Sequence, residues 1–397
     1  MRSALVVGAG LSGLAAAWRL REAGWHVSVV ERAGHPGGLI GTTETPHGRV
    51  ERAANAFVWT DTTARWFSSL GIEPRFASER SRRRYIYRDQ PRRWPLDVAE
   101  SAALGLRYGA HWITGRSKPR EDDTVAKWSD RVLGRAATEW LVGPALQGIY
   151  GAPPQALSAR AIFSGERRGR SRKMAAPAGG MGRFIDVLTN RLVERGVDFT
   201  FARGVDRLDP AVPTVVATDA PTAAGLLAPH APALAEAISG IDMFTITTIT
   251  AFYERWTRDL SGFGMLFPRA AGIGALGVLF NADVFDDASS VRSETWLYAG
   301  PATAAPIEQL RADRTRVVGH DREAMATHVT THVPGLPVYG PSVVTVRDAL
   351  GSLPPWLAVA GNFAGRLGVA RLLDGAEAAA ARLAWPSRRK AFTTWHS

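Results

Sequence analysis

Short apolar runs and a longer helical pattern alternate along the first thirty residues of the chain. Residues 4–7 form a continuous apolar run, and residues 14–23 have the Ala-rich apolar spacing of a packed helix. A second apolar run, 26–30, follows Gly24 and is rich in valine. The pattern therefore predicts a strand, a helix and a second strand, which is the unit of a parallel sheet.

Glycines occupy the turn between the first predicted strand and the helix. Gly8 permits a tight turn, Gly10 lets the backbone approach a pyrophosphate, and Gly13 lets helix and strand pack closely. The N-terminus of the helix then faces the phosphate charge. An acidic residue follows about 20 residues further on, where a ribose hydroxyl needs an acceptor. We therefore predict a dinucleotide site that includes Gly8, Gly10, Leu11, Ser12, Gly13, Glu31 and Arg32.

Further glycine-rich loops follow predicted strands at both ends of the chain. The pair Gly37 and Gly38 comes directly after the second strand, where it can lie against another part of the dinucleotide. Near the C-terminus, the apolar run 357–360 leads into a glycine-rich loop and an Ala-rich helix from Gly375. We therefore expect the two ends of the chain to build one dinucleotide domain together.

The middle of the chain is expected to form a separate substrate domain. Residues 61–173 have mainly helical periodicity. From residue 241 the pattern changes, and 241–253 predicts a long antiparallel strand with 273–280 and 295–298 as its partners. The shorter predicted elements are a capped helix over 122–133, a helix over 183–195, strands over 197–205 and 214–218, and an amphipathic helix over 320–333.

Together these elements predict an α/β fold. It combines a Rossmann-like dinucleotide-binding domain, built from discontinuous segments, with an inserted α+β substrate domain that is partly helical. We assign residues 1–60, 175–235 and 340–390 to the dinucleotide domain. Residues 61–174 form the helical part of the substrate domain, and 236–339 form its β-sheet part.

Composition narrows the possible functions. The chain has 397 residues, of which 46% are hydrophobic and 21% charged, as in ordinary globular proteins. It contains no cysteine, which excludes disulfides, thiolate metal sites, iron–sulfur clusters and a cysteinyl flavin link. The first strand begins almost at Met1 and no apolar run reaches about 18 residues, so we expect a cytoplasmic protein without a signal peptide or membrane span.

Charge favours anionic partners. The net charge of +11 comes largely from arginine, with concentrations at 80–93 and 167–173. Most of these side chains are expected to be solvated surface. No nucleic-acid module and no regular set of stacking aromatics accompanies them, so we expect no nucleic-acid partner. A membrane surface or a small anionic substrate fits the charge better.

Longer motifs give the chain a resemblance to the flavin-dependent amine oxidase superfamily. Within it, the chain resembles the protoporphyrinogen oxidases over nearly its whole length. Residues 51–57 are similar to the family's Glu-x-Gly-Pro-Asn-Ser-Phe, and 84–95 to its Arg-Phe-x-Tyr...Leu-Pro. Residues 141–158 resemble its Val-Ser-Gly-Val-Tyr-Ala-Gly-Asp-Pro...Leu-Ser segment, and 360–375 its Ala-Gly-Asn-Tyr...Gly-Val...Ser-Gly.

The resemblance implies non-covalently bound FAD and an oxidase that transfers hydride from its substrate to flavin N5. The adenosine would lie between Gly8 and Glu31, with a contact from the Val205 backbone, and the ribityl chain near Gly37 and Gly38. The remaining cofactor contacts that it implies are Leu39, Thr218, Gly361, Asn362, Gly368 and Val369.

Protoporphyrinogen, coproporphyrinogen or a related tetrapyrrole or polycyclic molecule is the expected substrate. A porphyrinogen has an apolar macrocycle with carboxylates, so its site needs a wide apolar cavity and a carboxylate-binding arginine. Arg84 occupies the family's substrate-arginine position. Asn55 is expected near the flavin, where it either hydrogen-bonds a pyrrole N–H or stabilises a turn. Gly148 and Tyr150 are expected to shape the cavity wall, and oxygen or a quinone to accept the electrons.

Two departures from the family pattern keep other functions open. Ala53 stands where relatives have glycine, and Leu39 where they often have a basic residue. One alternative is another enzyme of the superfamily, an amine oxidase or a desaturase. The other is a flavin- or nucleotide-binding protein without redox turnover.

Residues 95–115 predict an amphipathic surface helix that contains Trp112 and Arg107. Such a helix suits a bilayer interface, and it equally suits packing against the domain's own core. The protein is therefore expected in the cytoplasm, either free or peripheral to the inner face of the membrane.

His328 and His332 lie four residues apart, without a glutamate between them. Helical spacing alone would place them on one face. We expect them to form a polar face of the predicted helix over 320–333, and we expect no metal site.

Overall fold

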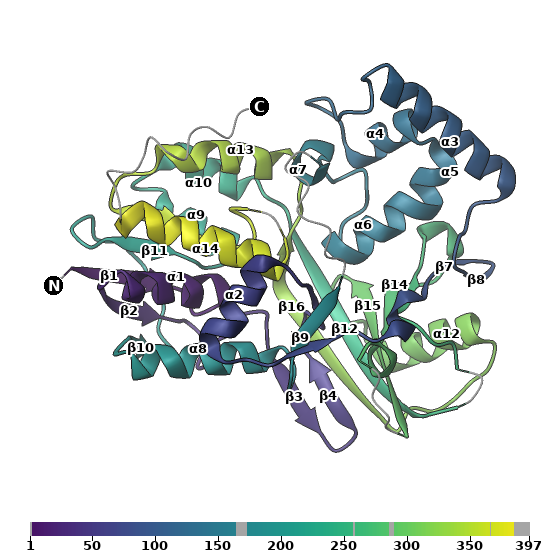
Figure 1. The fold of residues 1–397 in the computed structure, drawn as a ribbon, viewed down its shortest axis with the longest axis horizontal. Helices are drawn as coiled ribbons and strands as arrows, with labels where there is room; N and C mark the ends of the chain where they lie inside the picture. Colours follow the sequence, from purple (N-terminus) through teal and green to yellow (C-terminus); the bar gives the residue numbers. More distant parts are fainter. Residues whose placement is uncertain (1, 164–172, 257–258, 286–289, 366, 385–397) are drawn as a thin grey trace.

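The computed structural model describes residues 2–163, 173–256, 259–285, 290–365 and 367–384. Apart from Lys173, the predicted basic concentration at 167–173 lies outside these residues. A parallel sheet with helices on both faces occupies one side of the molecule, and a larger sheet with a block of helices occupies the other (Figure 1).

Five short parallel strands form the smaller sheet. Their order is β10 (Asp198–Thr200), β2 (His26–Val30), β1 (Ser3–Val7), β11 (Thr214–Val216) and β17 (Leu357–Val359). Val7 lies beside Val30 on one side and beside Val216 on the other. Strands from the beginning, middle and end of the chain are therefore neighbours, which confirms the predicted assembly of this domain from separated segments.

Two groups of helices cover the two faces of the parallel sheet. One group shares a core cluster that includes Leu14, Phe184 and Leu373, and consists of α1 (Leu11–Glu22), α2 (Asp61–Leu70), α8 (Gly182–Glu194) and α14 (Val369–Ala384). The other group packs around Val216 and consists of α9 (Ala220–Leu227), α10 (Pro232–Ser239) and α13 (Pro341–Ala349).

A seven-stranded mixed sheet forms the floor of the other half. Its order is β16 (Ala326–Pro337), β12 (Met243–Glu254), β15 (Val291–Ala299), β14 (Ala275–Phe280), β13 (Gly264–Leu266), β7 (Arg84–Arg88) and β8 (Gln90–Arg92). The predicted strands over 241–253, 273–280 and 295–298 are thus present and paired. Helix α12 (Pro306–Val318) buries Leu310 and Val317 in the core cluster of this sheet.

The remaining elements connect the two halves. The helical block consists of α3 (Val98–Ile113), α4 (Val125–Val132), α5 (Arg135–Ala137), the π-helical turn η2 (Thr138–Val142), α6 (Gly143–Tyr150) and α7 (Ala159–Phe163). Two small sheets contain β3 (Thr42–Thr45) and β4 (Gly48–Glu51), and β5 (Phe57–Val58), β9 (Met174–Pro177) and β6 (Pro74–Phe76). The short elements are α11 (Asn281–Val284), η1 (Glu79–Arg82), η3 (Arg269–Ala271) and η4 (Leu350–Ser352).

The predicted helix over 320–333 is wrong. Residues 326–337 instead form the edge strand β16, which pairs antiparallel with β12. The segment is dense in β-branched residues, which favour strands, and a ready partner strand outweighs the helical spacing of its apolar positions. His328 and His332 therefore lie on a strand.

The segment 61–174 is less uniform than expected. It contributes β7 and β8 to the large sheet, and α2 packs against α14 and α8 of the parallel-sheet domain. Two boundaries also differ, because the strand predicted over 197–205 is only three residues long and the Ala-rich helix begins at Val369.

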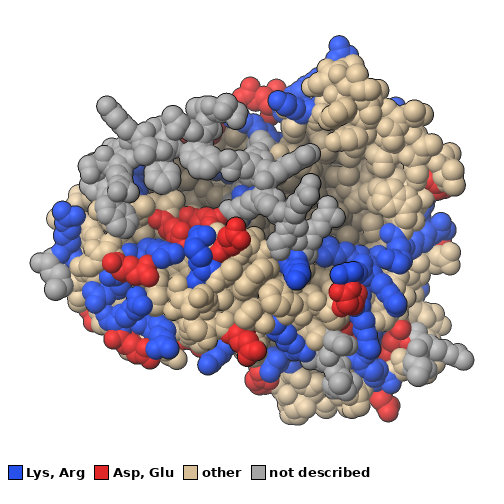
Figure 2. All heavy atoms as spheres, viewed as in Figure 1, with Lys and Arg blue, Asp and Glu red and all other residues tan. Residues whose placement is uncertain are grey.

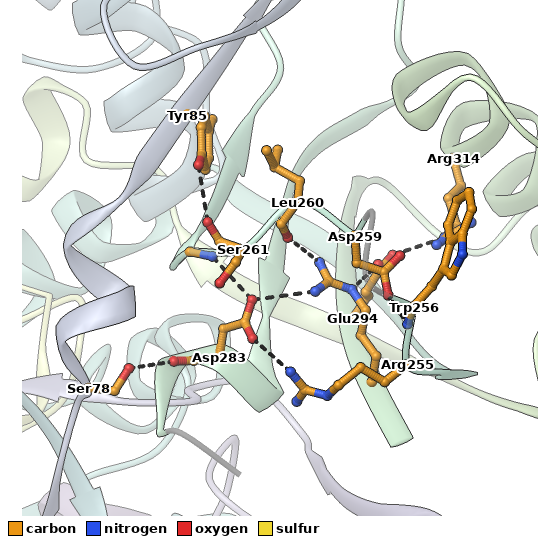
Figure 3. A network of polar contacts seen from close by, with 12 residues as sticks. Ser78, Tyr85, Arg255, Trp256, Asp259, Leu260, Ser261, Asp283, Glu294 and Arg314 are labelled. Atoms are coloured by element: carbon orange, nitrogen blue, oxygen red, sulfur yellow. Dashed lines mark hydrogen bonds and ion pairs between the residues drawn. The ribbon is translucent and has the colours of Figure 1, made fainter. Parts of the chain in front are cut away.

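Buried charged side chains hold α12 against the back of the large sheet (Figure 3). Alternation along β15 places Arg292 and Glu294 on this side. Glu294 accepts hydrogen bonds from Nε of Arg292 at 2.7 Å and from Nε of Arg314 at 3.2 Å. Burial opposes ionisation of Glu294, but the two guanidinium groups outweigh it and lower the pKa of this carboxyl below its usual value.

Asp283 extends the network to α11 (Figure 3). Its carboxylate lies 3.4 Å from Arg292 and 3.3 Å from Arg255, and it accepts a hydrogen bond from the Gly262 N–H at 3.1 Å. Its backbone carbonyl accepts a hydrogen bond from the Ser78 hydroxyl at 2.7 Å. The network therefore ties α11 to the loop before β13.

Asp283→Asn would keep the shape of this side chain and remove its charge. Because loss of one partner leaves a buried charge uncompensated, we expect the free energy of unfolding to fall by about 3 kcal/mol. Urea denaturation monitored by circular dichroism measures the change. The control Asp321→Asn removes an exposed ion pair with Arg311 and should leave the midpoint unchanged. Equal midpoints for both variants would contradict a structural role for the network.

Candidate functional site

The glycine turn after β1 is packed tightly at two positions and open at a third. A Cβ on Gly13 would lie 1.9 Å from the Gly8 carbonyl oxygen, and one on Gly8 would lie 2.5 Å from the Ala217 carbonyl oxygen. Gly8 also has a φ of +105°. A Cβ on Gly10 would meet nothing within 4 Å. The turn therefore requires glycine for packing at two positions and leaves space for a ligand at the third.

Helix α1 presents its N-terminus to this space. Gly10 is the N-cap and supplies no side-chain hydrogen bond, so the first N–H groups, at Leu11 and Ser12, have no side-chain cap. Glu31 stands beside them and accepts hydrogen bonds from the N–H groups of Ala9 at 2.7 Å and Ala33 at 2.8 Å. Free N–H groups and a positioned carboxylate suit a pyrophosphate and a ribose hydroxyl, respectively.

The other predicted cofactor residues surround the same edge of the sheet. Gly37 and Gly10 form an isolated parallel β-bridge, and the Gly37 N–H donates a hydrogen bond to the Ala9 carbonyl at 2.8 Å. A Cβ on Gly38 would lie 3.4 Å from the Gly10 Cα. Arg32 differs, because it is exposed and lies 3.3 Å from Asp219.

Segments from later in the chain reach this edge too. Val205 lies in an irregular stretch, close to the point where the Arg203 N–H donates to the Glu31 carbonyl at 3.0 Å. A Cβ on Gly361 would lie 3.6 Å from the Thr218 carbonyl oxygen. Gly361 and Gly368 have φ values of +145° and +117°, which favour glycine.

A cavity of about 1360 Å³ extends from Leu39 and the loop at Asn362 and Gly368 to the large sheet. The glycine turn after β1, Glu31 and Gly37 do not line it. Its walls include apolar residues from β12, β14 and β15, and the short helices α6 and α11. Seven of the residues predicted from sequence line it: Leu39, Asn55, Arg84, Gly148, Asn362, Gly368 and Val369. The structure therefore brings predicted cofactor and substrate residues to one continuous space.

Tyr150 lies behind the cavity wall. Its ring packs edge-on against Tyr339, with 5.1 Å between ring centroids, while Ile149 and Gly151 line the cavity. The Tyr339 hydroxyl donates to the Asn362 carbonyl. Gly148 lies in the wall itself, where a Cβ would come within 2.6 Å of Leu266.

Arginines outnumber acidic residues among the described residues that line the cavity. The charged ones are Arg49, Arg75, Arg84, Arg371, Glu44 and Glu51. Glu44 is paired with Arg49 at 2.8 Å. Arg84 lies with its guanidinium carbon 4.6 Å from the Phe263 ring centre, and no carboxylate among the described residues pairs with it. The cavity therefore offers a cationic group to an anionic ligand.

The sequence analysis did not predict several of these lining residues. Arg49, Arg75 and Arg371 belong to three different elements or loops, and no local pattern relates them. Glu51 stands within a quoted motif and His332 within a misassigned segment, so only the tertiary structure places them in the cavity.

Glu51 caps helix α8 from a distance. One carboxylate oxygen accepts from the Met181 N–H at 3.0 Å, and the other accepts from the Thr42 hydroxyl at 2.7 Å. The Thr42 oxygen accepts from the Gly182 N–H at 2.7 Å. Burial disfavours the charged form and outweighs these hydrogen bonds, which raises the pKa of Glu51 to about 7.

This raised pKa predicts a pH-dependent stability. In the unfolded chain the Glu51 pKa is 4.5, so between that value and about 7 the folded state holds the extra proton. We therefore expect the stability of the wild type relative to Glu51→Gln to fall as pH rises through this window, by at most about 3 kcal/mol. Denaturation of both proteins from pH 4.5 to 7.5 measures it. A difference that stays constant with pH would contradict the assignment.

Comparisons with known proteins agree with this geometry. The family model of an NAD(P)-binding Rossmann-like domain matches residues 6–70. Coproporphyrinogen III oxidase from Propionibacterium freudenreichii subsp. freudenreichii is 24% identical over 411 residues, which cover 82% of this chain and 77% of the relative.

Solved structures extend the similarity to the whole fold. A protein from Exiguobacterium sp. 255-15, provisionally assigned as a protoporphyrinogen oxidase, has a TM-score of 0.77 at 16% identity and covers 96% of this chain and 98% of its own. Cyclohexylamine oxidase from Brevibacterium oxydans IH-35A has a TM-score of 0.73 at 17% identity, with coverage of 96% and 98%. The predicted resemblance and fold class are therefore confirmed. The chain is similar in sequence to coproporphyrinogen III oxidases and to a protoporphyrinogen oxidase, and it has the fold of cyclohexylamine oxidase.

Proposed function

We propose that this protein is an FAD-dependent oxidase that acts on a porphyrinogen and passes the electrons to oxygen or a quinone. The observation that carries the substrate class is the arginine excess in a large apolar cavity next to the glycine loops. A porphyrinogen with propionate groups supplies the apolar body and the carboxylates that such a cavity binds. The relatives named coproporphyrinogen III oxidase support the same substrate class.

The same observation disfavours an amine substrate. A protonated amine would meet Arg84 without a compensating carboxylate, because Glu44 is already paired with Arg49 and both oxygens of Glu51 accept hydrogen bonds. Like charges repel each other, so an ammonium group is less favourable beside Arg84 than a carboxylate. The amine oxidases therefore share the fold with this chain, while the lining of its cavity fits an anion.

The residues present fit FAD. The open space at Gly10, the uncapped N-terminus of α1 and the carboxylate of Glu31 suit its pyrophosphate and ribose. We assign the other predicted cofactor residues, from Gly37 to Leu39 and from Gly361 to Val369, to the same ligand. When bound, FAD supplies the acceptor for a hydride. The chain itself binds a substrate carboxylate with Arg84, orients the macrocycle with Asn55 and the wall at Gly148, and excludes water, while Tyr150 supports that wall from behind.

A spectrum and a fluorescence assay test the proposal. Protein purified gently and supplied with FAD should show flavin absorption in the visible range. It should then form fluorescent porphyrin from protoporphyrinogen or coproporphyrinogen faster than the spontaneous rate. Absence of flavin absorption would contradict any flavoenzyme, whereas flavin without oxidation of either substrate would contradict the porphyrinogen assignment alone. Oxygen consumption against reduction of an added quinone identifies the acceptor.

Gly10→Ala tests the position of the pyrophosphate. Gly10 has φ −71° and ψ 173°, which alanine adopts readily, and its Cβ would meet no protein atom within 4 Å. We expect unchanged melting of the flavin-free protein and an affinity for FAD about 10- to 100-fold lower, because the methyl group occupies ligand space. Flavin titration measures it. Gly225→Ala, in α9 and equally free of neighbours, should bind FAD as the wild type does; weakened binding by both variants would contradict the assignment.

Arg84→Ala tests the carboxylate site. Loss of one charge-assisted hydrogen-bonding partner should raise KM for the porphyrinogen about 10- to 100-fold, or 1.5 to 3 kcal/mol. The flavin spectrum should be unchanged. Arg82→Ala is the matched control, since Arg82 is exposed and pairs with Glu79 at 2.8 Å. An unchanged KM in Arg84→Ala would show that another arginine binds the substrate.

We also propose that α3 docks on an anionic membrane surface. No residue of α3 is buried, and its apolar positions are open to solvent, with Leu106 76% and Ile113 79% exposed. Figure 2 shows a largely uncharged area over the helical block, with Lys and Arg side chains gathered below it near β7 and β8. An apolar face flanked by cations is typical of helices that lie in a bilayer interface. Among the described residues, no helix is long and apolar enough to cross a membrane.

Liposome flotation measures this docking. The protein should float with phosphatidylglycerol vesicles more than with phosphatidylcholine vesicles, because anionic lipid attracts the basic flank. Leu106→Glu should abolish flotation, since it places a charge in the apolar face. Val193→Glu, at an exposed valine of α8, is the control and should float like the wild type. Recovery of the wild type only in the soluble fraction would contradict the proposal.

A further inference from the structure

His332 lies at the cavity and has no part in the function described so far. It stands on β16, is 8% exposed and lines the cavity, and no carboxylate among the described residues forms an ion pair with it. His328, four residues earlier, packs its ring edge-on against Phe252 and does not line the cavity. On the neighbouring strand β12, His332 lies beside Ile246 and His328 lies beside Thr250.

One contact indicates which nitrogen of the neutral His332 ring carries the hydrogen. Nε2 lies 2.7 Å from the backbone carbonyl oxygen of Arg52. A carbonyl oxygen only accepts, so Nε2 must carry the hydrogen. In the neutral ring Nδ1 is then an acceptor with a free lone pair. Nδ1 has no hydrogen-bond partner among the described residues, and it is not among the buried polar atoms that lack one, so it is open to solvent.

The contact with Arg52 also connects His332 to a segment that lines the cavity. Arg52 directly precedes Ala53, Ala54 and Asn55, all of which line the cavity. His332 therefore lines the cavity and binds the backbone of the segment expected beside the flavin, and its second nitrogen has no partner in the part of the chain that the structure describes. Its orientation is set by a hydrogen bond, which is how general bases are held in place.

We propose that His332 is a catalytic base that accepts the pyrrole N–H proton of the substrate through Nδ1. The inference rests on the proposed porphyrinogen oxidation. In that reaction a meso carbon loses a hydride, for which FAD would be the acceptor when bound. The N–H bond of the adjoining pyrrole breaks, its electron pair forms the new double bond, and the proton passes to Nδ1. The resulting imidazolium releases the proton to water.

The two carboxylates among the described residues of the cavity already have partners. The hairpin of β3 and β4 contributes Glu44, His47, Arg49 and Glu51, and Arg52 follows it. Glu44 is paired, and both oxygens of Glu51 accept hydrogen bonds. On β12, which pairs with β16, the titratable residues Tyr253 and Glu254 lie at the far end of the strand from Ile246.

Substitution can separate a proton acceptor from a structural hydrogen bond. In His332→Gln the amide nitrogen can still donate to the Arg52 carbonyl, but no group replaces the basic Nδ1. We expect unchanged flavin absorption, a similar KM and a kcat lower by about 100-fold or more. The wild-type kcat should depend on pH as a base-catalysed step requires, and the variant should lack this dependence. His328→Gln is the matched control and should keep the wild-type rate and profile.

The outcomes are distinguishable. No oxidation by the wild type would contradict the proposed function and this inference with it. Oxidation by the wild type with the same kcat and pH profile in His332→Gln would overturn the inference alone. Loss of activity together with loss of flavin absorption in that variant would assign His332 a structural role and overturn it too.

A measurement on the wild type tests the ring directly. In ¹⁵N-labelled protein the His332 signal, assigned through its contacts with Ile246, should have the shifts of the Nε2–H tautomer. Added porphyrin should perturb Nδ1, because the ligand's pyrrole nitrogens lie beside it. A ring protonated at Nδ1, or a signal unaffected by saturating porphyrin, would contradict the inference.

Discussion

The close approach of α1 to the turn after β1 is the constraint on which the site depends. A side chain at Gly13 would collide with the Gly8 carbonyl at 1.9 Å, and one at Gly8 would collide with the backbone after β11. These contacts bring the start of the helix, the end of β2 and the segment after β11 to one edge of the sheet. Without them, the N–H groups of α1 and the carboxylate of Glu31 would not converge.

The two faces of the large sheet have different environments. One face lines the cavity, and the other packs into a core cluster. Alternation along β15 sends Ser293 and Leu297 to the cavity and Arg292 and Glu294 to the opposite side. The buried charges pair with one another, so they stabilise that face as a set. Arg314 of α12 pairs through Nε alone: its other two nitrogens have no hydrogen-bond partner among the described residues, and its guanidinium carbon lies 4.0 Å from the Tyr253 ring centre. The cavity face is thereby left largely free for apolar contact with a ligand, with Arg84 on β7 as a charged side chain of the sheet that lines it.

The site's chemistry is distributed over distant segments. Arg84 comes from an outer strand of the large sheet, Glu51 from a hairpin and His332 from the opposite edge strand. Each side chain has a different contact. Arg84 lies over the Phe263 ring, Glu51 accepts a hydrogen bond from the N-terminus of α8, and His332 binds the Arg52 carbonyl. A shared cavity lined by such separate contributions can be tuned for a new substrate at one wall without disturbing the cofactor end.

The sequence by itself determined the features that local chemistry specifies. The glycine turn, Glu31, the strand over 241–253 and the helix over 183–195 follow from patterns within a few residues, because turn geometry and strand or helix periodicity are local. Tertiary structure decided what depends on partners. Residues 320–333 have helical spacing, but 326–337 pair with β12 as a strand. Strand β7 lies in a segment with mainly helical periodicity, yet it pairs with β13 in the large sheet. Pairing with β12 gives β16 its place beside the cavity that His332 lines, and packing against Tyr339 holds Tyr150 behind the wall. Both contacts join segments far apart in the chain.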